Sequence, residues 1–116
     1  MTGRIYSEPA NLGREDLKRA LAERDIWLLR EAIVAVSLSD PDRRWVEHQL
    51  VDLMRDPDGS VRSIAALGVG HVARVHGSID RDLVLPVLRE LLGDAKARGN
   101  AENALDDIAM FARIAE

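Results

Sequence analysis

The chain has 116 residues, of which 47% are hydrophobic and 31% charged, and its formal net charge is -4 at pH 7. This length suits one folded domain, and this balance of apolar and charged residues excludes intrinsic disorder. The absence of cysteine excludes disulfides, thiolate metal sites and a cysteine nucleophile. No apolar run approaches the ~20 residues of a membrane span, and the first residues carry no apolar signal core, so we expect a cytoplasmic protein without a membrane partner.

The excess of acidic residues is concentrated in the C-terminal third of the chain. A protein that binds duplex nucleic acid needs a basic stripe that neutralises phosphates. This chain has no such stripe, so the charge pattern argues against a nucleic-acid partner.

In chain order, residues 1–11 are expected to form an extension, and residues 12–116 a single domain. Within the domain, apolar residues recur with the helical spacing i, i+3, i+4, i+7, and the alternation typical of strands is missing. A first and a second helix are marked by Leu17, Ala20 and Leu21 and by Leu29, Ala32, Ile33 and Val36.

Turn residues mark the next two helices. Asp40-Pro41 is expected to supply the N-cap and first residue of a third helix, and residues 56–60 form a polar connection with a cap for the fourth. The fourth helix is expected over Val61–His76, with Gly77 as its stop. The third helix carries Leu50, Leu53 and Met54, and the fourth carries the stripe Val61, Ile64, Ala65, Gly68, Val72 and Val75.

The remaining two helices repeat the same pattern. The fifth is marked by Leu88, Leu91 and Leu92, and the sixth by Ala101, Ala104, Leu105, Ile108, Ala112 and Ala115. The stripe that starts at Val61 therefore recurs at Ala101, and it also appears earlier at Leu29. Three copies of one stripe indicate an internal repeat, which predicts an all-α fold of six helices in three antiparallel pairs.

Two segments of the chain resemble the HEAT-repeat family. Residues 53–68 carry a turn aspartate, a Val-Arg pair and small residues, and residues 85–94 carry a first helix with a kinking Pro86. The resemblance implies a short α-solenoid of about three HEAT-like helical hairpins. It also implies a ladder between repeats, in which a Val-Arg arginine pairs with a turn acid. Arg30 and Arg62 hold the arginine place, and Glu102 in the third repeat is expected to end the ladder.

Several patterns that could indicate chemistry have plainer interpretations. The glycines of residues 68–73 superficially fit a dinucleotide fingerprint, but they lie inside a predicted helix, where small residues permit close packing. His71 and His76 are five residues apart, which does not suit two zinc ligands on one helix, and His48 lies elsewhere. Asp106 and Asp107 diverge by about 100° on a helix, so they do not flank one bond. We therefore expect no catalytic site, metal or cofactor.

The last predicted helix carries acidic and amide side chains with helical spacing, namely Glu102, Asn103, Asp106 and Asp107. One interpretation is a solvated end cap, which a terminal repeat needs for solubility. The other is an acidic contact surface for a basic partner. Both remain open at this point.

The two tryptophans have different predicted roles. Trp27 falls outside the apolar stripe of a helix that is apolar almost all round, so core burial is the first interpretation and an interface anchor the alternative. Trp45 is expected to contribute packing near the start of its helix.

The second helices of the three pairs are expected to share one face. Equivalent positions present Glu31, Ser63 and Asn103, and then Val34, Ala66 and Asp106. Small residues at the centre would admit a partner's loop, and carboxylates at one end would attract its cations. Such a face covers about 600 Å², against about 800 Å² per partner in a standard protein interface.

Residues 71–77 and 104–111 resemble small stand-alone bacterial HEAT-repeat proteins, some of which are similar to immunity proteins that neutralise a toxin encoded beside them. This resemblance implies a non-enzymatic protein-binding module that occludes a basic toxin domain. The alternative is an adaptor or scaffold that self-associates through the Trp27 helix or bridges other proteins. A HEAT-like glycosylase or lyase is disfavoured because the chain lacks a basic groove, a cysteine and a defined pocket. The candidate partner-binding residues are Trp27, Glu31, Ser63, His71, Arg74, Glu102, Asn103, Asp106, Asp107 and Met110.

Overall fold

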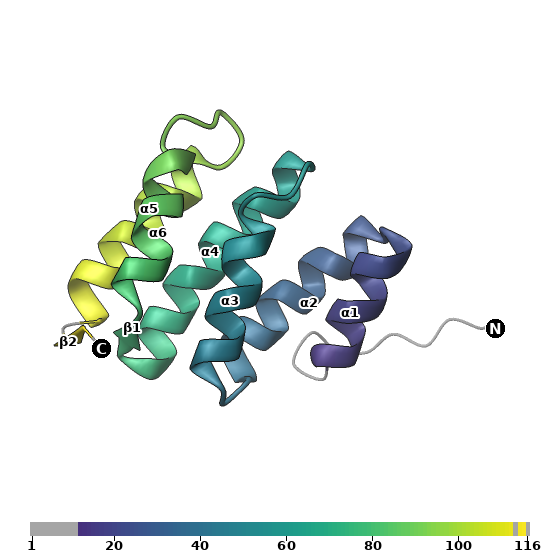
Figure 1. The fold of residues 1–116 in the computed structure, drawn as a ribbon, viewed down its shortest axis with the longest axis horizontal. Helices are drawn as coiled ribbons and strands as arrows, with labels where there is room; N and C mark the ends of the chain where they lie inside the picture. The colour runs from purple at the N-terminus through teal and green to yellow at the C-terminus, as the bar shows by residue number, and fades with distance from the viewer. Residues whose placement is uncertain (1–11, 113, 116) are drawn as a thin grey trace.

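The computed structural model describes residues 12–112 and 114–115, which fold into six α helices (Figure 1). In the described part, the strands are two-residue segments that pair in parallel. The prediction of an all-α fold is confirmed. The elements are α1 (Arg14–Glu23), α2 (Ile26–Ser39), α3 (Arg43–Leu53), α4 (Gly59–His76), β1 (Ser78–Ile79), α5 (Arg81–Leu91), α6 (Arg98–Phe111) and β2 (Ile114–Ala115).

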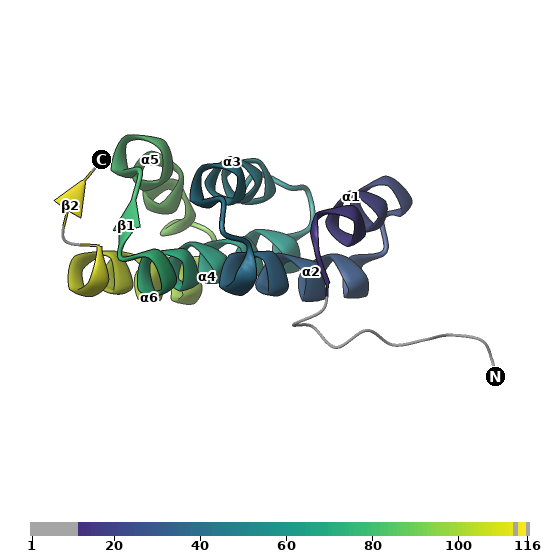
Figure 2. The same ribbon diagram turned by 90° about the horizontal axis from the view of Figure 1, so that it is seen from below.

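The six helices lie in two layers. Figure 2 shows α1, α3 and α5 in one layer and α2, α4 and α6 in the other. Each helix of the first layer is followed in the chain by one of the second, and the three resulting hairpins stand side by side (Figure 1). Helix α4 packs between α2 and α6 and also contacts α3.

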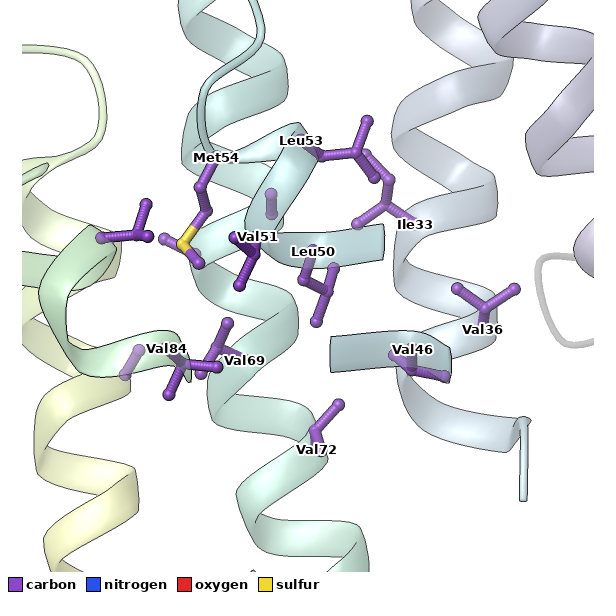
Figure 3. Close-up of a cluster of buried hydrophobic side chains, with 14 of the residues drawn as sticks. Ile33, Val36, Val46, Leu50, Val51, Leu53, Met54, Val69, Val72 and Val84 are labelled. Carbon is purple, nitrogen blue, oxygen red and sulfur yellow. The ribbon is translucent and has the colours of Figure 1, made fainter. Parts of the chain in front are cut away.

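The core lies between the two layers, and Figure 3 shows its central part. Ile33 on α2, Leu50 on α3 and Val69 on α4 are all 0% exposed. Val61 and Ala101, which begin two copies of the predicted stripe, are also fully buried, so the stripe faces the core as expected.

The predicted stripe of α4 ends at Val75. Val75 is half exposed, because it lies in the last turn of α4, just before the helix stops at Gly77. Gly77 ends α4 as predicted, and its φ of 67° places it in the left-handed region that favours glycine. The side chain of Ala115 lies outside the described residues.

Aspartates cap the start of four helices. Asp25, Asp58 and Asp80 accept backbone N–H groups of the first turns of α2, α4 and α5. The prediction that Asp40 caps the third helix is wrong. Pro41 lies in the turn, and Asp42 is the N-cap of α3, with its carboxylate 3.1 Å from the amide nitrogen of the third helical residue.

Asp40 instead links the two helices of the first hairpin. It ends α2 and accepts a hydrogen bond of 2.8 Å from Arg14 Nε on α1. The guanidinium of Arg14 also stacks on Trp45, 4.1 Å from the ring centroid. Trp45 is partly buried against the core, which confirms its predicted packing role.

The glycines of α4 allow neighbouring helices to approach closely, as predicted. A Cβ on Gly68 would stand 2.6 Å from Ser37 Oγ and 3.0 Å from Leu50 Cδ2. A Cβ on Gly70 would collide with the carboxylate of Asp107 on α6. Bare backbone at these two positions therefore lets α2, α3 and α6 pack onto one helix.

The predicted ladder is present, but its first rung uses a different arginine. Arg62 Nε lies 2.7 Å from Asp94 Oδ2, as expected for the second rung. Both carboxylate oxygens of Asp56, however, accept hydrogen bonds from Arg24, at 2.8 and 2.9 Å, and Arg30 does not reach them. Arg24 ends α1 in a left-handed conformation, with a φ of 52°, and this directs its side chain toward the second hairpin.

The ladder ends at the third hairpin, as expected. Glu102 lies 3.4 Å from Arg98 Nε within its own helix, and in the described part of the chain it has no partner on another hairpin.

Candidate protein-binding face

The exposed large apolar side chains all belong to one layer. In the described residues they are Trp27 (61% exposed), Leu38 (47%), Val75 (50%), Met110 (64%) and Phe111 (40%). They lie on α2, α4 and α6, and the helices of the other layer contribute none. The exposed apolar surface is therefore concentrated where the second helices of the hairpins meet solvent.

Trp27 is not in the core, so its predicted burial is wrong. Helix α2 turns Leu29 and Ile33 toward the first layer, and both are fully buried. Trp27 is two residues before Leu29, which places it about 200° around the helix. The alternative interpretation, an exposed side chain available to a partner, agrees with its position.

We define the outer face as the side of α2, α4 and α6 that points away from the first layer. Its members recur every three or four residues along each helix, and each is at least partly exposed. They are Trp27, Glu31, Val34 and Leu38 on α2, Leu67, His71 and Arg74 on α4, and Asn103, Asp106 and Met110 on α6.

Two residues predicted on the shared face of the second helices are not available to a partner. Ala66 is fully buried, because it turns toward the packed side of α4, and Leu67 and His71 occupy the outer side instead. Ser63 is half-buried and engaged, since Asn100 Nδ2 donates to its hydroxyl at 2.9 Å and to its carbonyl at 3.1 Å. The centre of the outer face therefore does not carry the exposed small residues that were expected to admit a partner's loop.

A charged cluster joins α4 to α6 on the outer face. Arg74 Nη1 lies 2.6 Å from Asp107 Oδ2, and this carboxylate packs against bare Gly70. Arg74 also contacts the Nδ1 atom of His71 through its other terminal nitrogen. Burial lowers the pKa of His71, and the nearby Arg74 charge lowers it further, while Asp107 acts in the opposite direction. At neutral pH, His71 is therefore uncharged and Nδ1 can accept a hydrogen bond from Arg74.

The acidic residues of α6 consequently differ in availability. Asp107 is held by Arg74, and Glu102 faces Arg98 at 3.4 Å with both side chains more than half exposed. Asp106 is exposed and forms no hydrogen bond or ion pair with any residue that the structure describes. Of these three carboxylates, Asp106 is the one free to bind a cation from a partner.

The histidine and acidic side chains of the described residues are spread over the fold. Over residues 12–112, no three histidine, aspartate or glutamate side chains gather in a way that could hold a metal ion. Asp106 and Asp107 lie in different surroundings, because Arg74 pairs with Asp107 and Asp106 has no such partner among the described residues. No helix in the described ranges has the length and apolar character needed to cross a bilayer.

Sequence reasoning missed three exposed apolar residues, Leu38, Val75 and Phe111. Leu38 could have been found, because it is eleven residues after Trp27 and so lies on the same side of the helix three turns later.

Comparison with known proteins adds no assignment, since no family model, curated protein or solved structure matches the chain.

Proposed function

We propose that this chain is a non-enzymatic, cytoplasmic protein-binding module of the HEAT-repeat type, and that its outer face engages a basic protein. The observation that carries the proposal is the confinement of exposed large apolar side chains to α2, α4 and α6. Three of these side chains, Trp27, Leu38 and Met110, belong to the outer face itself. Exposed apolar groups on one face are typical of interaction sites, in which Trp and Met are enriched. The three helices together offer about 600 Å², so the face and its edges approach the size of a standard interface.

Charge supports a basic partner. The chain has a net charge of -4, and Asp106 is a free carboxylate at the α6 edge of the outer face. Carboxylates in this position attract a cationic protein and accelerate its encounter. A basic toxin domain encoded nearby is the partner that fits best, and the chain would neutralise it by covering its surface.

Titration with the protein encoded by the adjacent reading frame tests this function. We expect sub-micromolar binding at low salt and weaker binding at high salt, because salt screens exposed charges. Absence of binding at both salt concentrations would contradict the proposal.

Reversing the charge of Asp106 should weaken that binding. Asp106→Lys is expected to slow association about tenfold at low salt, with little effect in high salt. The control is Asp52→Lys, which makes the same charge change at an exposed position on α3, in the other layer. Stopped-flow kinetics compares the two variants, and equal slowing by both would mean that net charge rather than the outer face controls association. Asp107 is unsuitable for this test, because its replacement also removes the ion pair with Arg74.

Self-association through α2 is the second candidate function, and the exposure of Trp27, 61%, favours it. A dimer that buries Trp27 should dissociate on dilution and be lost in Trp27→Ala. Light scattering over a concentration series checks this, and a constant monomer mass would exclude this candidate.

A further inference from the structure

Arg30 on α2 lacks a partner in the described part of the chain. Its side chain is half-buried, and its Nε atom is buried without a hydrogen-bond acceptor. Arg81 also has a buried, unpaired Nε, but its terminal nitrogen donates to the carbonyl of Ala112. A buried donor without an acceptor is costly, so it calls for a physical explanation.

The loss of the ladder rung explains why Arg30 is unpaired. In the second rung Arg62 pairs with Asp94, and the equivalent acid for Arg30 is Asp56. Both oxygens of Asp56 are already engaged by Arg24, and one of them also accepts the backbone N–H of Asp58. The guanidinium of Arg30 is therefore left without a carboxylate, because Arg24 binds the one that corresponds to it.

This guanidinium lies beside the most prominent apolar stripe of the outer face. Arg30 is one turn after Trp27, and Val34 and Leu38 continue the stripe along the helix. Tryptophan and arginine are the residue types most enriched among side chains that dominate binding energy. A guanidinium also binds a carboxylate through two parallel hydrogen bonds, which gives orientation as well as affinity.

We propose that Trp27 and Arg30 form an anchor for a partner segment that carries a carboxylate next to apolar side chains. The carboxylate accepts hydrogen bonds from the terminal nitrogens of Arg30, because the Nε atom is buried. The apolar side chains of the partner cover Trp27, Val34 and Leu38. The inference rests on the proposed function, because it takes the outer face as the protein-binding surface.

The anchor also determines how the partner is oriented. Helix α2, which carries Arg30, and helix α6, which carries Asp106, lie on opposite sides of α4 (Figure 2). Helices packed about 10 Å apart place the axes of α2 and α6 roughly 20 Å from each other. A partner with an acidic group at one edge and cations at the other fits this face in one direction. Reversal would bring like charges together at both edges.

Selection from a displayed library of random sixteen-residue peptides tests the anchor. Peptides are selected on the wild-type chain and counter-selected on the Trp27→Ala/Arg30→Gln double variant. We expect the recovered peptides to carry Asp or Glu beside large apolar residues. Recovery of peptides without acidic residues, or of no peptides, would overturn the proposal.

The affinity of a recovered peptide is then measured on single variants. Arg30→Gln is expected to weaken binding about tenfold, whereas Arg44→Gln, the same change at an exposed arginine of α3, should have no effect. Replacing the acid of the peptide by its amide should cause the same loss on wild type and no further loss on Arg30→Gln. Equal affinity for wild type and Arg30→Gln would overturn the anchor, provided thermal unfolding shows that both are folded.

The anchor and the proposed function can fail separately. Binding of the neighbouring gene's product that depends on Asp106 but not on Trp27 or Arg30 rejects the anchor and supports the proposed function. Peptide binding that depends on Arg30, together with no binding of that product, supports the anchor and rejects the toxin partner.

Discussion

Replacing Leu50 with alanine is expected to lower the free energy of unfolding by about 3 kcal/mol. Leu50 is 0% exposed and lies on α3 between the two layers (Figure 3). Its Cδ2 atom stands 3.0 Å from the place where a Cβ would lie on Gly68. Because Gly68 has no side chain to move into the space, the cavity left by the substitution stays open. Urea denaturation measures the loss, and the melting temperature should fall by roughly 10 °C.

Leu38→Ala is the matched control for this prediction. It removes the same atoms from a side chain that is 47% exposed on α2, so the change should stay within about 0.5 kcal/mol. Similar losses in both variants would contradict the placement of the core between the two layers.

Replacing Asp56 with asparagine is expected to cost about 2 kcal/mol. Asp56 is 8% exposed, and its two oxygens accept from Arg24 at 2.8 and 2.9 Å. Asparagine can still accept the N–H of Asp58, but it loses the charge and one acceptor. The Arg24 side chain is 45% exposed, so water screens part of the ion pair and keeps the loss below that of a fully buried pair.

The control for Asp56→Asn is Glu90→Gln. Glu90 faces Arg55 at 3.6 Å, and both side chains are more than half exposed, so the expected effect is near zero. Chemical denaturation at pH 7 gives the free energy of unfolding of both variants. A large loss in Glu90→Gln would show that burial does not determine how much each ion pair contributes to stability.

Asp56 should also influence the stability of the folded chain in acid. Arg24 lowers the pKa of Asp56 in the folded chain, and Arg14 and Arg62 do the same for Asp40 and Asp94. The stabilisation from a lowered pKa is present above the ordinary aspartate value of about 4 and is lost as the pH falls through the folded value. Asp56→Asn should therefore reduce the loss of stability between neutral and acidic pH.

Glu47 has the opposite effect on the pH dependence of stability. It is 1% exposed, and burial raises its pKa although it accepts the backbone N–H of Asp80. A raised carboxyl pKa favours the folded state when the group is protonated, so acid offsets part of the loss from the aspartates. Sequence reasoning did not find Glu47, because a glutamate in the middle of a helix gives no sign of its burial.

Local sequence patterns are enough to predict the helices and much of their boundaries. The spacing of apolar residues, the cap at Asp58 and the stop at Gly77 all act within a few residues, so they can be read along the chain. The burial of Val61 and Ala101 followed from the same spacing, because one apolar side of each helix must face the other layer.

Contacts between remote residues, in contrast, depend on how the helices pack. Helix α2 is apolar almost all round, so its composition favoured burial on every side, whereas the packing leaves Trp27 exposed. The rung to Asp56 depended on the left-handed end of α1 at Arg24, and the engagement of Asp107 depended on α6 packing against bare Gly70. These contacts join residues more than thirty positions apart. They depend on the distance and angle between packed helices, which local sequence patterns do not encode.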